Sequence, residues 1–352
     1  MKILITGCCG FIGTNLCLKL LENENFCIYG IDNIYNNYNT DFKLENLELL
    51  KKYEKFIFYQ EDLLVTDKIS LIKPDKIIHL ASIPGVRKSL DEPLLYVKNN
   101  IETFVKILED CKNTGIKDII YASSSSVYGK NEKIPFCEED RIDNLQSSYA
   151  CSKKCMEVYA KYYHDVFQLN TIGLRFFTVY GPHGRPDMAP FMFLKNIAEG
   201  KSINQYGDGT SIRDYTFVDD IVNGIISIVN GNGQSGEIYN LGNNKPVSLL
   251  QFISLCEKIT RKKAIINRVG NQTGDVPKTY ADLEKSYKYL NYKPRINLEQ
   301  GLKMTYEWMV ENKRVNLKEG DCLFFLATQY HHVNSNRCDG RCIMAGNILY
   351  TL

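Results

Sequence analysis

The segment Lys2–Gly13 reads KILITGCCGFIG, and the elements predicted around it decide the fold. Its apolar run, Ile3–Ile5, is short and closely followed by a glycine, as is typical of a strand buried on both faces of a parallel sheet. Leu16, Leu20 and Leu21 then fall on one face of an amphipathic run, which predicts a helix. The segment therefore predicts a strand, a tight turn and a helix in succession.

Three glycines stand where this strand must turn into the helix. Gly7 permits the tight turn, Gly10 lets backbone approach a pyrophosphate, and Gly13 lets the helix lie close to the sheet. A second strand, Cys27–Ile31, ends at Asp32, whose carboxylate is placed to bind an adenosine ribose and to repel the 2′-phosphate of NADP. The sequence therefore predicts an NAD site, the alternative being a glycine-rich turn in an unrelated α/β domain.

Length and composition indicate a globular protein with a substantial core, divided into two lobes. The chain has 352 residues, of which 44% are hydrophobic and 24% are charged, and both fractions are typical of soluble proteins. A net charge of +2 without a basic run argues against nucleic acid as a partner. Because no leader and no apolar run of about 18 residues is present, we expect a cytoplasmic protein with reduced cysteines and no membrane contact.

Strands and helices alternate along the first half of the sequence. Further strands are predicted at Phe56–Tyr59, at Lys76–Ala81, at Asp118–Ala122 and from Thr171, and helices from about Asp41, from about Pro93 to Asn113 and from Tyr149. This alternation predicts an α/β fold, a doubly wound parallel Rossmann sheet with a smaller mixed C-terminal substrate lobe. We expect the NAD-binding domain at 1–183, rejoined by 212–243, and the substrate lobe at 184–211 and 244–314, with a tail at 315–352.

Several polar residues follow the predicted strands. Asp62 is placed to reach an adenine amino group or, alternatively, to cap the next helix. His79 is interpreted as a packed strand residue rather than a catalyst. Arg87 lies in a turn-rich loop at the carboxyl end of the sheet, where doubly wound folds bind ligands, and Asn99 is expected to bond backbone near the cofactor.

A polar cluster and a helix predict the chemistry. Ser123–Ser126 follow the fifth strand, and Tyr149 and Lys153, four residues apart, share one helix face. A phenol has a pKa near 10, but an ammonium and an oxidised nicotinamide both favour the phenolate. Lowering that pKa by about 3 units requires roughly 4 kcal/mol. A serine can relay the proton, so the order of motifs predicts a catalytic group rather than a solvated helix face.

The residues Gly7, Gly10, Gly13, Ser124, Tyr149 and Lys153 resemble the extended short-chain dehydrogenase/reductase family, in its nucleotide-sugar epimerase and dehydratase group. The resemblance covers about residues 1–314. Within this group, GVRKS at 85–89 and GPHGRPDMA at 181–189 are most similar to the UDP-glucuronate 4-epimerases.

The resemblance implies a reaction and its cofactor. Tyr149 would take the proton of the sugar C4 hydroxyl with help from Ser124, while NAD takes the hydride and Lys153 holds the nicotinamide ribose. The 4-keto sugar would turn over and regain its hydride on the other face, so NAD should stay bound. The implied NAD contacts are Gly7, Gly10, Phe11, Ile12, Gly13, Asp32, Asn33, Asp62, Leu63, Leu80, Ala81, Ser82, Asn99, Tyr149, Lys153 and Phe176.

The resemblance also implies how a UDP-sugar is held. Ser125, Ser126, Thr178 and Arg185 would receive the C6 carboxylate, with Arg87 as a second cation. The uracil, ribose and diphosphate would contact the small lobe through Gln205, Tyr206, Arg213, Gln272 and Asp275. The family also implies a homodimer, formed by a four-helix bundle from residues 93–113 and 152–167, and no metal in the site.

Other functions stay open. A 4,6-dehydratase needs an acid and a base where Ser125 and Ser126 stand, and a UDP-glucuronate decarboxylase shares the first step. A UDP-glucose or UDP-N-acetylhexosamine 4-epimerase would give Arg185 no anion to bind. A non-catalytic sensor would be expected to have lost Tyr149 or Lys153. In the tail, zinc ligation is weighed against an appended segment without a catalytic role; the candidate ligands are Cys322, His331, His332, Cys338 and Cys342.

Overall fold

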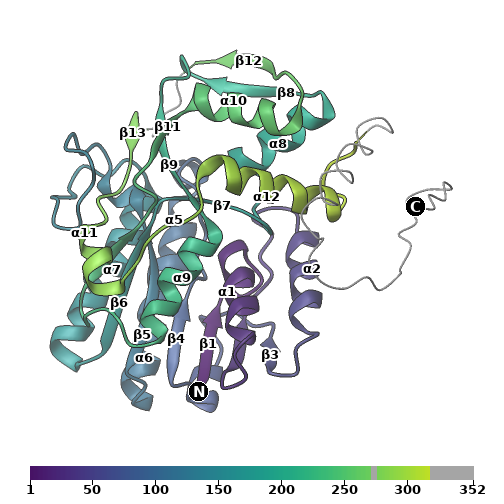
Figure 1. The fold of residues 1–352 in the computed structure, drawn as a ribbon. Helices are drawn as coiled ribbons and strands as arrows, with labels where there is room; N and C mark the ends of the chain where they lie inside the picture. Colours follow the sequence, from purple (N-terminus) through teal and green to yellow (C-terminus); the bar gives the residue numbers. More distant parts are fainter. Residues whose placement is uncertain (271–275, 318–352) are drawn as a thin grey trace.

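A seven-stranded parallel sheet forms the centre of the fold in the computed structural model, which describes residues 1–270 and 276–317 (Figure 1). The strand order is β10-β6-β5-β4-β1-β2-β3, so the order reverses between β1 and β4. Ligands bind at such a switch point, beyond the carboxyl ends of the strands. The predicted doubly wound fold is confirmed. The strands are β1 (Lys2–Thr6), β2 (Cys27–Ile31), β3 (Phe56–Tyr59), β4 (Lys76–His79), β5 (Asp118–Ser124), β6 (Asn170–Phe176) and β10 (Ile238–Leu241).

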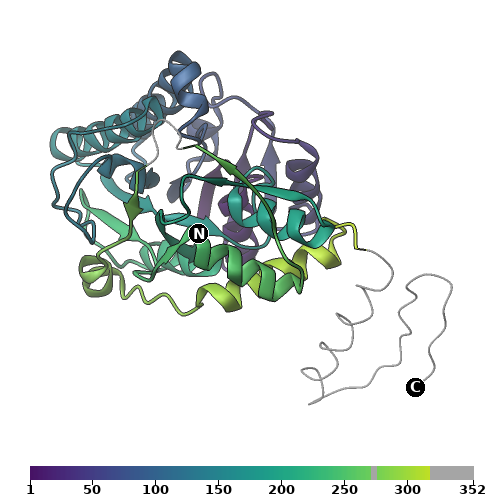
Figure 2. The same ribbon diagram turned by 90° about the horizontal axis from the view of Figure 1, so that it is seen from above.

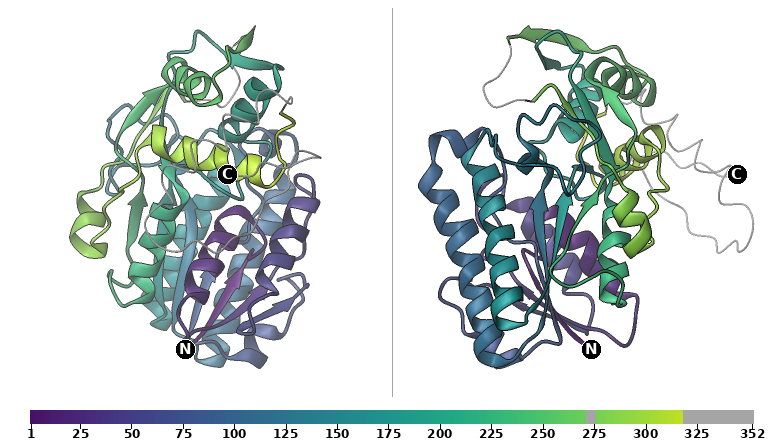
Figure 3. Two further views of the ribbon diagram at one scale, coloured as in Figure 1. Left: turned by 45° about the vertical axis from the view of Figure 1, so that its right-hand side comes forward. Right: turned by 90° about the vertical axis from the view of Figure 1, so that its left-hand side faces the viewer.

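Helices cover both faces of this sheet, as Figure 3 shows. One face carries α1 (Phe11–Leu21), α2 (Asp41–Leu50) and α9 (Val218–Val229), and the other carries α6 (Thr103–Thr114) and α7 (Ser148–Phe167), which pack side by side. The predicted helix 93–113 is α5 (Pro93–Tyr96) and α6 joined by a π-helical segment, Val97–Glu102. Shorter helices of this lobe include α3 (Lys68–Ile72), α4 (Lys88–Asp91) and α11 (Glu284–Leu290), which packs against β10 and α9.

A smaller lobe sits above the carboxyl ends of the large sheet (Figures 1 and 2). Its four-stranded sheet has the order β11-β9-β13, with β7 also paired to β9, and β8 and β12 form a separate parallel pair. Its elements are β7 (Thr178–Tyr180), α8 (Ala189–Glu199), β8 (Ser202–Tyr206), β9 (Ile212–Phe217), β11 (Pro246–Ser248), α10 (Leu249–Thr260), β12 (Ile265–Val269), β13 (Lys278–Thr279) and α12 (Leu298–Glu311). Of the segment 212–243, β9 belongs to this lobe, whereas α9 and β10 return to the large sheet.

The apolar residues of β1 serve both faces of the large sheet. Ile3 and Ile5 pack into the core beneath α1 and α9, and Leu4 packs into the opposite core with Phe104 and Met156. Each fully buried side chain of this size contributes about 1.5–3 kcal/mol. A third core lies between α8, α10 and α12. None of the helices in the described residues is long and apolar enough to cross a membrane.

Candidate active site

A cavity of about 1020 Å³ opens between the carboxyl ends of the large sheet and the small lobe. All sixteen predicted cofactor contacts line it, from Gly7 to Phe176, and so does Ser124. Of the predicted substrate contacts, the lining residues are Arg87, Ser125, Ser126, Thr178, Arg185 and Tyr206. One cavity therefore brings together the residues that were chosen from separate motifs.

The glycine turn leaves no room for side chains. Gly7 has a φ of +72°, and a Cβ there would lie 2.8 Å from the backbone nitrogen of Ala81. A Cβ at Gly13 would lie 2.1 Å from the carbonyl oxygen of Gly7. Within the described residues, no side chain caps the amino end of α1, so backbone N–H groups and the positive end of the helix dipole face the cavity. The turn thus fits a dinucleotide pyrophosphate.

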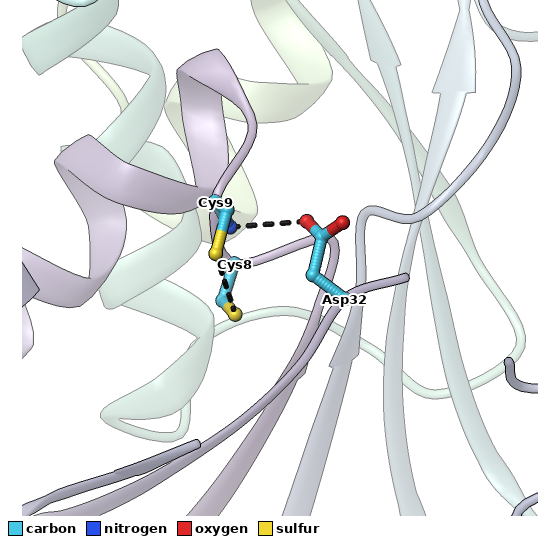
Figure 4. Close-up of side chains that lie close together, drawn as sticks. All are labelled: Cys8, Cys9 and Asp32. Carbon is cyan, nitrogen blue, oxygen red and sulfur yellow. Dashed lines mark hydrogen bonds between the residues drawn. The ribbon is translucent and has the colours of Figure 1, made fainter. Parts of the chain in front are cut away.

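Asp32 lies at the end of β2 with its carboxylate beside the turn (Figure 4). It accepts hydrogen bonds from the backbone N–H groups of Cys9 at 3.1 Å and Ile34 at 2.8 Å. Burial raises its pKa, and the charge of Lys43 and these two bonds oppose that rise. Lys43 itself donates to the carbonyl of Tyr35 at 2.7 Å. Because its charge also acts on Asp32, a buried cation lies next to the predicted ribose site.

Tyr149 and Lys153 project from the first turns of α7, which begins where the Ser147 hydroxyl accepts from the Ala150 N–H at 3.1 Å. Lys153 is buried, donates to the Ala122 carbonyl at 2.7 Å and lies 6.0 Å from the centre of the Tyr149 ring. Burial lowers the pKa of Lys153 to about 7. Burial raises the pKa of Tyr149, while a hydrogen bond to Ser124 and the charge of Arg185 lower it. Ser124 and Arg185 therefore both favour the phenolate.

The serine cluster divides between two tasks. Ser123 donates to the Glu157 carboxylate at 2.6 Å, and Glu157 binds the Arg175 guanidinium through two bonds of 2.9 Å. Ser124, in contrast, is hydrogen-bonded to Tyr149, and its hydroxyl lies 3.1 Å from that of Ser126. The hydroxyl beside the phenol is thus that of Ser124.

Two arginines reach the cavity from loops on opposite sides. Arg185 is held by Asp187 through bonds of 3.0 and 2.6 Å. The Arg87 guanidinium lies 4.5 Å from the centre of the Tyr206 ring and so connects the sheet lobe to β8. Cationic groups therefore flank the cavity where it meets the small lobe.

The comparisons with known proteins agree on one family. Residues 3–242 match the family described as the NAD dependent epimerase/dehydratase family. The chain belongs to this family. An uncharacterized protein of Methanocaldococcus jannaschii is 46% identical over 317 residues, which cover 89% of this chain and 97% of that protein. A UDP-glucuronate 4-epimerase of Thermodesulfobacterium geofontis is 41% identical over 314 residues, 88% of this chain and 96% of that protein.

Solved structures lead to the same family. The crystal structure of a UDP-glucuronic acid 4-epimerase from Bacillus cereus, in complex with UDP-glucuronic acid and NAD, superposes with a TM-score of 0.84. It is 37% identical, and the match covers 89% of this chain and 100% of that chain. The predicted family, the predicted enzyme class and the predicted cofactor, NAD, are confirmed.

Some predicted contacts of the epimerase do not line the cavity. Gln205 is buried and donates to the Gly207 carbonyl at 3.4 Å, whereas its neighbours Asn204 and Tyr206 line the cavity. Arg213 donates to the carbonyls of Ile212 and Pro277. Gln272 and Asp275 lie outside the described residues. These four contacts stay predictions.

Other polar residues resolve choices that the sequence left open. The Asp62 carboxylate accepts from the Leu64 N–H at 2.9 Å, as a local turn cap does, and it also lines the cavity. His79 is fully buried against Thr6 at 2.8 Å, which confirms it as a packed strand residue. Asn99 donates to the Leu95 carbonyl of its own helix at 2.9 Å.

Two residues of the site were missed. Asn100 is fully buried, bonds both backbone groups of Ile83 and donates to Ser152, so it holds the loop beneath the cavity. Lys43 lines the cavity beside Asp32. The sequence feature that could have indicated Lys43 is its position three residues before Asn46, on the buried face of α2.

Proposed function

We propose that this epimerase interconverts UDP-glucuronate and UDP-galacturonate through a 4-keto intermediate. The observation that carries the substrate is the position of Arg185, whose charge is close enough to Tyr149 to lower the pKa of that phenol. A C6 carboxylate is attached to the carbon next to C4, so a sugar whose C4 hydroxyl meets Tyr149 brings its anion toward this guanidinium. The named relatives support the same substrate.

The roles of the residues follow from their contacts. Tyr149 removes the proton of the C4 hydroxyl, and Ser124, bonded to the phenol, shares the same oxygen. Bound NAD supplies a hydride acceptor at C4 that later returns the hydride. Lys153, which donates to the Ala122 carbonyl, also hydrogen-bonds the nicotinamide ribose in this proposal. The glycine turn holds the pyrophosphate, and Asp32 with Lys43 holds the adenosine ribose.

Arg185 is positioned before substrate arrives. Asp187 engages its Nε and one Nη2 hydrogen, and a guanidinium offers five donors, so N–H groups remain for a carboxylate. The hydroxyls of Ser125, Ser126 and Thr178 line the same cavity. Charge-assisted bonds of this kind also hold the carboxylate against loss as carbon dioxide from the 4-keto acid.

Product analysis with UDP-glucuronate tests the proposal. We expect UDP-galacturonate and no net consumption of NAD. UDP-xylose as the main product would establish the decarboxylase instead, and turnover of UDP-glucose in preference to UDP-glucuronate would remove the role of Arg185. A 4,6-dehydratase is disfavoured because Ser125 and Ser126 offer neither a carboxylic acid nor a carboxylate.

The Tyr149→Phe variant separates an enzyme from a sensor. It keeps the aromatic ring but removes the hydroxyl, so turnover should fall by at least about 10²-fold while NAD and UDP-sugar still bind. Full retention of function would favour a non-catalytic nucleotide-sugar sensor.

A homodimer in the cytoplasm completes the proposal. Apolar side chains of α7 are exposed in the single chain, including Val158 at 56% and Val166 at 56%, and Leu94 of α5 is 79% exposed. Such faces on the paired helices α6 and α7 suit a four-helix bundle between two copies. The mass in solution tests the dimer, cell fractionation tests the location, and limited proteolysis tests the domain boundaries at 183, 212 and 243.

A further inference from the structure

Two adjacent cysteines lie within the dinucleotide turn, between Gly7 and Gly10, and have no part in the proposed reaction. Cys8 and Cys9 are fully buried, and their sulfur atoms are 3.8 Å apart (Figure 4). Gly30 of β2 makes room for the Cys8 sulfur, because a Cβ there would lie 2.6 Å from it. The Asp32 carboxylate is the third group, and the three ligand atoms all lie within 4.8 Å of one another.

The spacing of these atoms fits a tetrahedral metal ion. With zinc–sulfur bonds of about 2.3 Å, two thiolates on one tetrahedral ion are about 3.8 Å apart, the separation found here. Thiolate ligands select thiophilic ions such as zinc over magnesium and calcium. The Asp32 carboxylate is the third ligand, and zinc accepts carboxylate oxygen as well as thiolate sulfur.

The charges also balance at this place. Two thiolates and the Asp32 carboxylate carry three negative charges, and a divalent ion supplies two positive ones. Lys43 is close enough for its charge to interact with both Cys9 and Asp32, and its ammonium supplies the third positive charge. The buried cluster would thus be close to neutral with an ion bound, which limits the desolvation cost of the ligands.

We propose that Cys8, Cys9 and Asp32 form a binding site for a thiophilic divalent cation of the zinc class, and that this cation competes with NAD. Binding forms two metal–sulfur bonds and one metal–oxygen bond, and it releases the two thiol protons to solvent. The competition rests on the proposed function of Asp32, since a carboxylate that ligates the ion turns away from the adenosine ribose. Asp32 lines the cavity, so the site adjoins it, whereas both thiols are buried behind this carboxylate.

Titration with cadmium tests this site, because cadmium thiolates absorb in the ultraviolet. The full-length chain is used with Cys322, Cys338 and Cys342 replaced by serine, so that the tail cannot contribute. We expect one Cd²⁺ per chain, a thiolate band, and an apparent Kd for Cd²⁺ raised at least tenfold by saturating NAD. By linkage, saturating Cd²⁺ must weaken NAD binding by the same factor.

Matched variants locate the ion. Cys8→Ala and Cys9→Ala should each raise the Kd for Cd²⁺ at least tenfold, and the double variant should lose the band while still binding NAD, which shows that it is folded. The control is Cys137→Ser, because Cys137 belongs to the other candidate group among the described residues, with Glu138 and Glu139. It should keep the band.

Three results would overturn the proposal: a chain that binds NAD but gives no band, a band that persists in the double variant, or a band that NAD leaves unchanged. None of the three depends on turnover. A chain that binds NAD but fails to epimerise UDP-glucuronate would contradict the proposed function alone, whereas NAD binding without the cadmium band would contradict this site alone.

Discussion

Replacement of Arg185 by glutamine is expected to remove recognition of the substrate carboxylate while leaving the rest of the nucleotide sugar bound. Asp187 holds the guanidinium at 3.0 and 2.6 Å, so its direction is fixed before substrate arrives. Only 17% of the side chain is exposed, and a pair formed there is therefore weakly screened.

The size of the effect follows from the bonds that are lost. A hydrogen bond to a charged group contributes about 1.5–3 kcal/mol, which corresponds to about 10- to 140-fold in affinity. We expect a loss in this range for UDP-glucuronate. For UDP-glucose, whose C6 carries a neutral hydroxyl, the loss should be smaller, about 2- to 13-fold, which corresponds to about 0.5–1.5 kcal/mol.

Calorimetric titration of both ligands into both proteins gives a double-mutant cycle, in which the carboxylate of the ligand is the second change. Any disturbance from leaving Asp187 unpaired affects both ligands and cancels. Arg268→Gln is the control, because Arg268 is exposed on β12 and should alter neither affinity. Equal losses for the two ligands would show that Arg185 does not bind the carboxylate.

Three further predictions concern stability and cofactor binding. Glu157→Gln should lower the free energy of unfolding by about 3–5 kcal/mol, because it leaves a buried arginine unpaired, whereas Asp165→Asn in an exposed pair should cost at most about 1 kcal/mol; urea unfolding measures both. Gly13→Ala should abolish NAD binding in a fluorescence titration, because its Cβ would lie 2.1 Å from the Gly7 carbonyl oxygen. Burial raises the pKa of Glu138 to about 7, so the folded state holds this proton more tightly than the unfolded state. The contribution of the protonated Glu138 carboxyl to the free energy of unfolding is then full below about pH 4.5 and is lost as the pH rises to 7. Glu138→Gln should therefore match the wild type near pH 4.5 and exceed it by about 3 kcal/mol at pH 8, and equal stability at both pH values would contradict this.

Local patterns predicted the large lobe well. The segment KILITGCCGFIG specifies a buried strand, a turn that only glycine can make and a helix, and all three depend on neighbours in sequence. The pair Tyr149 and Lys153 could be found because four residues span one helical turn. The family resemblance then added the contacts that come from loops.

Contacts between distant segments could not be predicted in the same way. Glu157 on α7 and Arg175 on β6 form a buried ion pair. Nothing in the sequence of either segment indicates that the two residues are in contact. On β8, a shift of one residue exchanges the two faces, which is why Tyr206 lines the cavity and Gln205 does not. Lys43 was missed because its burial on α2 depends on the loops that this helix packs against.

The electrostatics of the site link the strength of the base to the state of its ligands. The pKa of Tyr149 stays above its ordinary value even with Ser124 bonded to it and Arg185 nearby. A substrate carboxylate paired with Arg185 cancels part of that positive charge and raises the pKa further. Tyr149 can then release its proton only beside another cation. Because the pKa of Lys153 is about 7, that lysine is only partly protonated at neutral pH. The oxidised nicotinamide carries the missing positive charge and loses it on reduction. Tyr149 is therefore available as a phenolate base when NAD is oxidised and C4 can give up its hydride, and it keeps the proton, for return to the C4 oxygen, once the 4-keto sugar has formed, which is the alternation that an epimerase with a retained cofactor requires.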